Sequence, residues 1–442
     1  MGRLSRTLAE RDRRIVALAV PALGTLATEP LYVLVDTAIV GRLGTVPLGG
    51  LALASTVLTT LLWVFNFLAY GTTARVAFLM GRGDRRAAAG VAAQGLWLAT
   101  GIGLTLAAAI AAGGRLLAGL LGGEGPILEA ATTYLRISAL GMPAVLVALV
   151  GHGYLRGLSD TRTPLLVVVV ANVTNVVLEV LLVYGLDLGV AGSAWGTVVA
   201  QLLAAGWFAV LVGRRVVDAD ADLAPVWSEM RRLVVVGRHL FTRTGALLAT
   251  LALSTAVAAR VGPSTLGGHQ IALQVFTFLA LAVDALAIAA QALVGTFLGA
   301  GRTEEAVGTG RRLLGFGAVT GGAVGVVVAA TAWLLPHVFT TDPAVAHRAT
   351  VALLFLAALQ VPAAVTFVLD GVLMGASDFR FLQWSTVAAA LAFVPFAAAV
   401  LSRHRLGIGG IWAGLLAWVL VRAAANAVRF RRRRWMAVTA SG

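Results

Sequence analysis

The sequence contains no cysteine and no lysine. Without cysteine the chain can form neither a disulfide nor a thiolate metal site. Without lysine it cannot contain the phosphate-binding loop Gly-x-x-x-x-Gly-Lys-Ser/Thr, which excludes ATP hydrolysis by that loop. The six histidines are scattered without metal-ligand spacing, and no Ser/His/Asp pattern stands out. These absences predict a protein that is not an enzyme and that has no cofactor.

Charged residues are scarce as well. They make up 12% of the 442 residues, about half the fraction usual in soluble proteins, whereas 59% of the residues are hydrophobic. Mean hydropathy is +0.91. The apolar runs are continuous rather than alternating, which favours membrane helices and excludes a β-barrel. We therefore predict an all-α polytopic membrane protein.

Twelve apolar segments are long enough to cross a bilayer, which takes roughly 20 residues each. The run that begins at Ile15 is too long for the core of a signal peptide, so it is predicted to remain as the first span. The segments are 15–40, 49–80, 88–112, 126–151, 163–185, 190–212, 233–261, 267–298, 309–334, 344–373, 380–401 and 407–428.

An even number of spans places both termini on the same side of the membrane. All 34 basic residues are arginine, and 23 of them lie in the termini and the even-numbered loops, against six in the odd-numbered loops. Since arginine-rich loops stay in the cytoplasm, we predict a plasma-membrane protein with both termini cytoplasmic. The net charge of +14 then reflects contact with anionic lipid headgroups rather than with nucleic acid.

The two halves of the chain repeat at an offset of 218 residues. Gly103 and Gly321 match at this offset, each in a ridge of small residues that allows close helix contact. Pro143 and Pro362 differ by 219, which predicts a local one-residue insertion. Three short motifs also match at 218, namely 81–83 with 299–301, 159–162 with 377–380, and 189–192 with 407–410.

Each half contains six spans, so the halves have the same orientation. We predict two pseudo-symmetric six-helix lobes related as a parallel repeat, with a substrate site between them, as is typical of transporters. The N-lobe is predicted at 1–213, a cytoplasmic linker at 214–232, the C-lobe at 233–430 and a basic cytoplasmic tail at 431–442.

Four stretches carry a resemblance to one family of transporters. They are 29–31 with 35–44, 155–164, Asn175 and Glu179 followed by 189–194, and 284–295. Together and in order they resemble the MATE (multidrug and toxic compound extrusion) family, most of all its DinF-like branch, and the resemblance covers nearly the whole chain. It implies cation-driven antiport and a cation-coupling site in the N-lobe.

Asp36 and Glu179 are the main candidates for cation coupling. Each lies about five residues before the outer end of its span, so both reach the same depth at roughly 1.5 Å per residue. Asn175 is one helical turn below Glu179, and Thr197 reaches a similar depth from the sixth span. Matching positions form the N-lobe cation site in the family. Glu179 stands where an aspartate is common, so its longer arm favours H⁺ over Na⁺; a purely structural role for either acid is the alternative.

Four further polar residues within the spans are predicted to line a substrate cavity: Asp284, Asn66, Glu29 and Asp370. A charge at mid-bilayer costs about 2.5–3.5 kcal/mol, so such residues should face a cavity, pair or titrate. For Asp284, pairing with an arginine is the alternative. Arg243, early in the seventh span, is predicted to extend toward the cytoplasm or to pair with an acid.

Pro21 and Pro30 mark where the first span can bend, because proline removes a backbone donor. We predict a monomeric secondary active multidrug efflux transporter that exchanges amphipathic or cationic compounds for H⁺, or else Na⁺, by alternating access. A flippase for a lipid-linked sugar precursor is the main alternative, but it would need a more basic cavity and usually more spans. A channel or a membrane enzyme would need a filter or catalytic signature, and none stands out.

Overall fold

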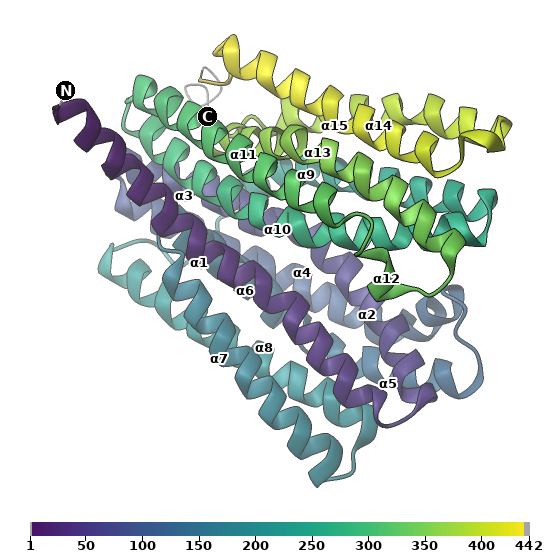
Figure 1. The fold of residues 1–442 in the computed structure, drawn as a ribbon. Helices are drawn as coiled ribbons and strands as arrows, with labels where there is room; N and C mark the ends of the chain where they lie inside the picture. Colours follow the sequence, from purple (N-terminus) through teal and green to yellow (C-terminus); the bar gives the residue numbers. More distant parts are fainter. Residues whose placement is uncertain (1, 437–442) are drawn as a thin grey trace. The chain divides into compact units, whose positions relative to one another are not determined.

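The computed structural model describes residues 2–436, which are almost entirely helical and contain no β-strand (Figure 1). The last part of the predicted basic tail, 437–442, lies outside the described residues. The elements are α1 (Gly2–Gly41), α2 (Thr45–Phe65), α3 (Phe67–Gly81), α4 (Arg85–Leu120), α5 (Gly125–Ala139), α6 (Met142–Gly157), α7 (Arg162–Val180), the π-helical turn η1 (Leu181–Gly185), α8 (Gly189–Asp218), α9 (Trp227–Val261), α10 (Pro263–Gly299), α11 (Thr303–Thr331), α12 (Pro336–Phe339), α13 (Pro343–Gly375), α14 (Phe379–Ser402), the 3₁₀ turn η2 (His404–Leu406) and α15 (Gly407–Arg431).

The helices account for the predicted spans. Eleven stretches of the described chain are long and apolar enough to cross a membrane, and α2 with α3 forms one of them. The twelfth is the pair α5 and α6, which bend by 54° at Leu140 and Gly141. Pro143 follows this break, and it cannot donate the backbone hydrogen bond that would continue a straight helix. The prediction of an all-helical chain with twelve spans is confirmed.

The chain divides into two compact units. One is Val20–Gly237, and the other joins the first nineteen residues to the chain from Arg238 onward. The predicted lobe 1–213 therefore differs from the observed unit at both ends. The start of α1 belongs with the second unit because Arg312 donates two hydrogen bonds to the Asp12 carboxylate, at 2.7 and 2.6 Å.

Residues 214–237 form part of the first unit rather than a free linker. The Gln94 side chain donates to the carbonyl of Ala224 at 2.8 Å and accepts from the amide of Val226 at 2.7 Å. Trp97 Nε1 donates to the carbonyl of Leu223 at 2.8 Å. Three hydrogen bonds from α4 thus hold the segment that we predicted as a linker at 214–232.

The internal repeat is visible in the backbone of both units. Four pairs of residues with a positive φ angle are separated by 218 positions. They are Gly44 and Gly262, Gly83 and Gly301, Ser159 and Ser377, and Gly189 and Gly407. Because a positive φ is rare outside glycine, its recurrence at one offset marks equivalent turns.

Close helix contacts repeat at the same offset. A β-carbon at Gly50 would come within 2.9 Å of the Ala131 amide nitrogen, and one at Gly268 within 2.8 Å of the Ala349 amide nitrogen. Likewise Gly103 lies against Pro143, and Gly321 lies within 3.1 Å of Val361 Cα by the same measure. Val361, not Pro362, is therefore the counterpart of Pro143. The predicted one-residue insertion is wrong at this contact.

Each unit has its own apolar core. In the second unit one cluster gathers residues of α9, α10, α13, α14 and α15, with Phe393 and Trp412 fully buried. Helices α14 and α15 lie side by side there (Figure 1). The first unit is built from smaller clusters, one of which centres on Phe208. The packing of α7 on α8 in the first unit corresponds to that of α14 on α15 in the second.

Candidate functional site

Three helices of the first unit bring polar side chains together at one place. Each helix contributes two residues four positions apart, which puts them on the same helical face. These residues are Tyr32 and Asp36 of α1, Asn175 and Glu179 of α7, and Ser193 and Thr197 of α8. The four residues predicted for cation coupling thus lie in one cluster.

Hydrogen bonds tie the three helices to one another. Ser193 Oγ donates to Asp36 Oδ1 at 2.7 Å, which joins α8 to α1. The Thr197 hydroxyl accepts from Asn175 Nδ2 at 3.2 Å and lies 2.9 Å from the Tyr32 hydroxyl. Thr197 therefore connects all three helices through a single oxygen atom. Movement of one helix would alter the hydrogen bonds that this oxygen makes with the other two.

Glu179 is the unusual member of the cluster. Its side chain is fully buried, and neither carboxyl oxygen has a hydrogen-bond partner among the described residues. Its polar neighbours are the Asp36 carboxyl group and Ser193. Two ionised carboxylates only accept hydrogen bonds, so they repel each other unless one carries a proton or a cation lies between them. The arrangement can therefore bind and release a proton or a small cation.

The ligand set also has the chemistry of an alkali-cation site. Asn175 Oδ1 has no partner among the described residues, and the carboxyl and hydroxyl groups nearby supply further oxygens. Hard cations prefer oxygen ligands. No described side chain forms an ion pair with Asp36 or Glu179. The space next to the two carboxyl groups therefore contains no arginine of the described chain and can accept a proton or a cation.

A cavity of about 210 Å³ adjoins this cluster within the first unit. Its walls are mainly apolar, and it shares three residues with the cluster. Among its other polar lining atoms, Gln201 Oε1 and His152 Nδ1 have no partner in the described part of the chain. The lining consists of Tyr32, Val145, Ala148, Leu149, His152, Val168, Ala171, Asn172, Asn175, Thr197, Ala200, Gln201 and Ala204.

Asp370 has a different environment in the second unit. It is 3% exposed, and its Oδ2 atom accepts from Arg243 Nη2 and Arg422 Nη2, both at 2.6 Å. Asn426 Nδ2 donates to Oδ1 at 2.7 Å. These three donors occupy the carboxylate, so the contacts do not support the predicted cavity role of Asp370. Arg243 pairs with this acid and is buried instead of extending toward water.

The repeat shows that neither cluster is duplicated. At an offset of 218, Asn175 and Glu179 correspond to Phe393 and Ala397, both of which are buried in the apolar core of the second unit. Conversely, Asp370 and Asn426 correspond to His152 and Phe208, whose rings lie 4.7 Å apart. The two units share a backbone but carry different chemistry.

The other predicted residues do not join the cluster. Glu29 is exposed on α1, Asn66 lies at the junction of α2 and α3, and Asp284 is half-buried in the second unit. None of them lines the cavity beside Thr197. Pro21 and Pro30 lie within α1, which continues through both.

Sequence reasoning missed two members of the cluster, Tyr32 and Ser193. Tyr32 lies four residues before Asp36, and Ser193 lies four residues before Thr197, so helical spacing was the available signal. The sequence spacing of His152 and Gln201 gave no indication that they line the cavity. Each reaches the cavity only because its helix packs against the neighbouring helices.

The MatE family model matches residues 21–181 and 247–399 of the chain. The chain is 33% identical over 431 residues to Protein DETOXIFICATION 44, chloroplastic, of Arabidopsis thaliana, covering 95% of this chain and 82% of the relative. It is 29% identical over 446 residues to DNA damage-inducible protein F of Escherichia coli (strain K12), covering 98% and 95%. A solved structure described as MATE in the bent conformation shares the fold, with a TM-score of 0.90, 22% identity, and coverage of 98% of this chain and 97% of that chain.

Proposed function

We propose, from the premise that this chain belongs to the MATE family of multi-pass membrane transporters, that it exports amphipathic compounds in exchange for an inward-moving cation. The observation that carries the proposal is the buried carboxyl pair of Asp36 and Glu179, which has no protein cation beside it. Such a pair is stable only when it takes up a proton or a small cation, and that requirement can couple ion movement to a change of conformation.

A proton fits the pair better than Na⁺ does. A shared proton needs only two carboxyl oxygens that face each other, since the protonated group donates to the ionised one. Na⁺ needs a shell of several oxygens. Here Asp36 Oδ1 already accepts from Ser193, and the Thr197 hydroxyl already bonds Asn175 and contacts Tyr32. Coordination of Na⁺ would therefore have to reorganise these hydrogen bonds, whereas a shared proton leaves them in place.

Coupling follows from the residues that the carboxyl cluster and the cavity share. Tyr32, Asn175 and Thr197 line the cavity and also belong to the hydrogen-bond network of the carboxyl pair. Protonation of the pair changes the network, and the network forms part of the cavity wall. Substrate and proton then have different affinities in the two conformations, which is the condition for antiport. Pro21 and Pro30 leave backbone carbonyls without helical partners, so α1 can bend there.

The cavity also defines the class of substrate. Apolar walls with a few unpaired polar atoms suit amphipathic compounds. About 210 Å³ is less than the roughly 300–1,000 Å³ of a drug-sized pocket, so this cavity takes one group of a larger substrate. When deprotonated, the carboxyl pair attracts a cationic substrate. Asp284, Asn66 and Glu29 are proposed to contact the part of the substrate that extends beyond this cavity.

We propose that the transporter is a monomer in the cell membrane. Both termini are proposed to lie in the cytoplasm, because arginine dominates the termini and the even-numbered loops. The chain has no native cysteine, so one cysteine introduced at the exposed Arg82 reports the side of that loop. Labelling of this cysteine from outside intact cells by a membrane-impermeant reagent would contradict the orientation.

Dye efflux from proteoliposomes under imposed gradients tests the function. One proton that moves down about 100 mV and one pH unit releases about 3.7 kcal/mol, which can sustain a several-hundredfold gradient of a neutral solute. We expect a pH gradient alone to drive efflux and a Na⁺ gradient alone to have little effect. Efflux driven only by Na⁺ would reverse the ion assignment. Efflux that continues after both gradients collapse would exclude antiport.

A further inference from the structure

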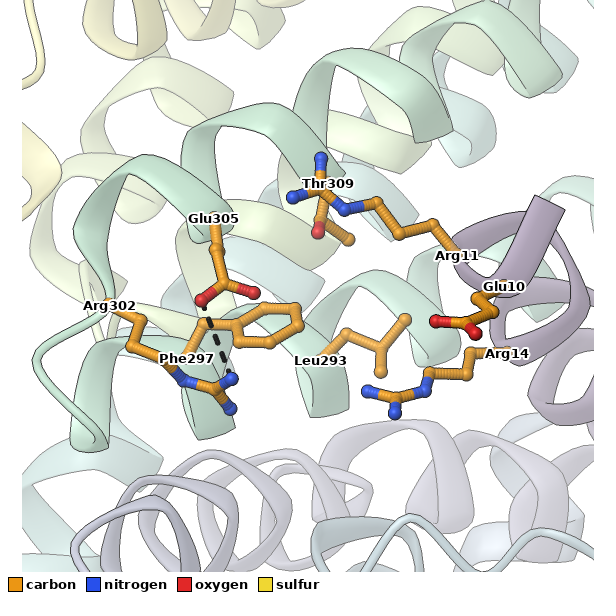
Figure 2. Close-up of a pocket in the computed structure, with 8 residues that line it drawn as sticks. All are labelled: Glu10, Arg11, Arg14, Leu293, Phe297, Arg302, Glu305 and Thr309. Atoms are coloured by element: carbon orange, nitrogen blue, oxygen red, sulfur yellow. Dashed lines mark ion pairs between the residues drawn. The ribbon is translucent and has the colours of Figure 1, made fainter. Parts of the chain in front are cut away.

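A second cavity, of about 200 Å³, lies within the second unit (Figure 2). It is formed by the first part of α1, the end of α10 and the start of α11. Its lining consists of Glu10, Arg11, Arg14, Leu293, Phe297, Arg302, Glu305 and Thr309. Since these segments are helix ends, the cavity belongs to the polar edge of the membrane and not to its centre.

The lining carries more positive than negative charge. Arg302 is paired with Glu305 at 3.4 Å, and its guanidinium lies 4.8 Å from the centre of the Phe297 ring.

Arg11 and Arg14 form no ion pair with any described residue. Asp12, which lies between them in the sequence, forms its ion pair with Arg312. Glu10 also lines the cavity, and Figure 2 draws its carboxylate beside Arg14, so the three arginines and two glutamates of the lining sum to a charge of +1. Neither Arg11 nor Arg14 lies within ion-pair distance of a described carboxylate, so both guanidinium groups are open to an anion.

Thr309 adds an independent observation. It lies one turn after Glu305 on α11 and is 2% exposed, yet its hydroxyl has no hydrogen-bond partner among the described residues. A buried hydroxyl without a partner is costly, so a ligand oxygen that accepts a hydrogen bond from Thr309 would be stabilised there. Figure 2 places Thr309 and Arg11 on one side of the cavity and Arg302 and Arg14 at its other edges.

We propose that this cavity binds a phosphate group, with the headgroup of an anionic lipid as the main source and free phosphate as the other. Guanidinium groups bind phosphate oxygens with charge-assisted hydrogen bonds, and the Thr309 hydroxyl can donate to a further oxygen. Leu293 and Phe297 give the cavity an apolar floor, which suits the start of a lipid rather than a fully hydrated ion. Because Arg11 and Arg14 belong to α1 while Thr309 belongs to α11, the ligand joins the same two helices as the Asp12–Arg312 pair.

Lipid binding by the full-length protein tests this proposal. The protein is reconstituted in nanodiscs of phosphatidylcholine with or without phosphatidylglycerol, and lipid that remains bound after extraction is measured by native mass spectrometry. Inorganic phosphate is added in a separate arm to protein in phosphatidylcholine alone, and thermal stability is recorded in each arm. The test variants are Arg14→Gln and Thr309→Val. Arg13→Gln is the matched control, because it removes the same charge from the next residue, which is exposed and does not line the cavity.

We expect selective retention of phosphatidylglycerol, with affinity about tenfold lower in Arg14→Gln than in Arg13→Gln, since a charge-assisted hydrogen bond is lost. Non-specific attraction to an anionic membrane surface would be weakened equally in Arg14→Gln and Arg13→Gln, because each variant loses one positive charge. Thr309→Val removes no structural hydrogen bond, so a weaker affinity in that variant reports direct contact with the ligand. Stabilisation by phosphate alone, sensitive to the same variants, would assign the site to free phosphate. Equal loss in Arg14→Gln and Arg13→Gln, or no binding in either arm, would overturn the proposal.

Discussion

Glu179 and Asp370 are both buried acids, yet their contacts give them opposite properties. Asp370 accepts hydrogen bonds from two arginines and an asparagine, so its carboxylate has positive partners within the protein. Glu179 has no donor among the described residues and faces the carboxyl group of Asp36. The first acid is held in an ion-paired cluster. The second has no donor or cation beside it in the described chain, so its contacts leave room for a proton or a cation, which is the property that the proposed coupling requires.

Asp36→Asn tests coupling at the scale of a single residue. The amide keeps the size of the side chain and can still accept from Ser193, but it can no longer exchange a proton. We expect coupled efflux to be lost while substrate binding to the cavity remains, because the cavity lining does not include Asp36. Dye efflux under a pH gradient and equilibrium dye binding are measured on the same purified protein.

Glu179→Gln is the companion variant and should cause a similar or smaller loss of efflux, since the Asp36 carboxyl group remains in the cluster. Both variants need membrane expression matched to the wild type, because an unfolded variant would also fail to transport. Wild-type efflux by Asp36→Asn under a pH gradient would make Asp36 a structural residue and would remove the proposed mechanism.

At the scale of helices, glycine sets the closest approaches. In the first unit α2 meets α5 at Gly50, and in the second α10 meets α13 at Gly268. At both places the neighbour is backbone, which cannot move aside as the end of a flexible side chain can. Small residues at such contacts allow the van der Waals packing that holds membrane helices together.

Gly50→Ala should therefore destabilise the protein. The added methyl group would lie 2.9 Å from the Ala131 amide nitrogen, and overpacking of this kind costs about 1–3 kcal/mol. Gly206→Ala in α8 is the control, because nothing lies within 4 Å of its β-carbon position. That change should be neutral or stabilise the helix by about 0.5–1 kcal/mol. Thermal unfolding in detergent measures both, and equal unfolding temperatures would show that the Gly50 contact is looser than described.

At the scale of the whole molecule, one backbone plan is used twice with different side chains. The first unit has the carboxyl pair and an open cavity, whereas the second has apolar residues and a buried ion cluster at the equivalent places. Ala204, which lines the cavity, corresponds to Arg422 at the offset of 218. Duplication thus explains the fold, and divergence explains why the proton and substrate functions are proposed for one unit.

Transfer of the second unit's ion pair tests this divergence. In the double variant His152→Asp with Ala204→Arg, the new side chains occupy the positions of Asp370 and Arg422, which lie 2.6 Å apart through Oδ2 and Nη2. The arginine should fill the cavity and abolish dye binding. Ala204→Ser adds one oxygen but little volume, so it should retain binding. Dye binding at the wild-type level in the double variant would place the substrate site elsewhere.

The sequence by itself determined the number of spans, the repeat and the acids that meet in the polar cluster of the first unit. Hydropathy is a local property, so twelve apolar runs are visible without tertiary structure. Asp36, Asn175, Glu179 and Thr197 could be grouped because helical rise converts position along a span into depth. Their role in coupling stays a prediction.

Tertiary structure alone decided which helix faces meet. Arg243 and Arg422 are 127 and 52 residues from Asp370, so no local pattern could show that both bind the same carboxylate. The cavity beside Thr197 and the cavity beside Thr309 also arise where residues of three or more helices pack together. The sequence indicates the depth of a residue in the membrane, whereas the neighbours of that residue depend on how the helices rotate and approach one another, and only packing of the folded chain sets those.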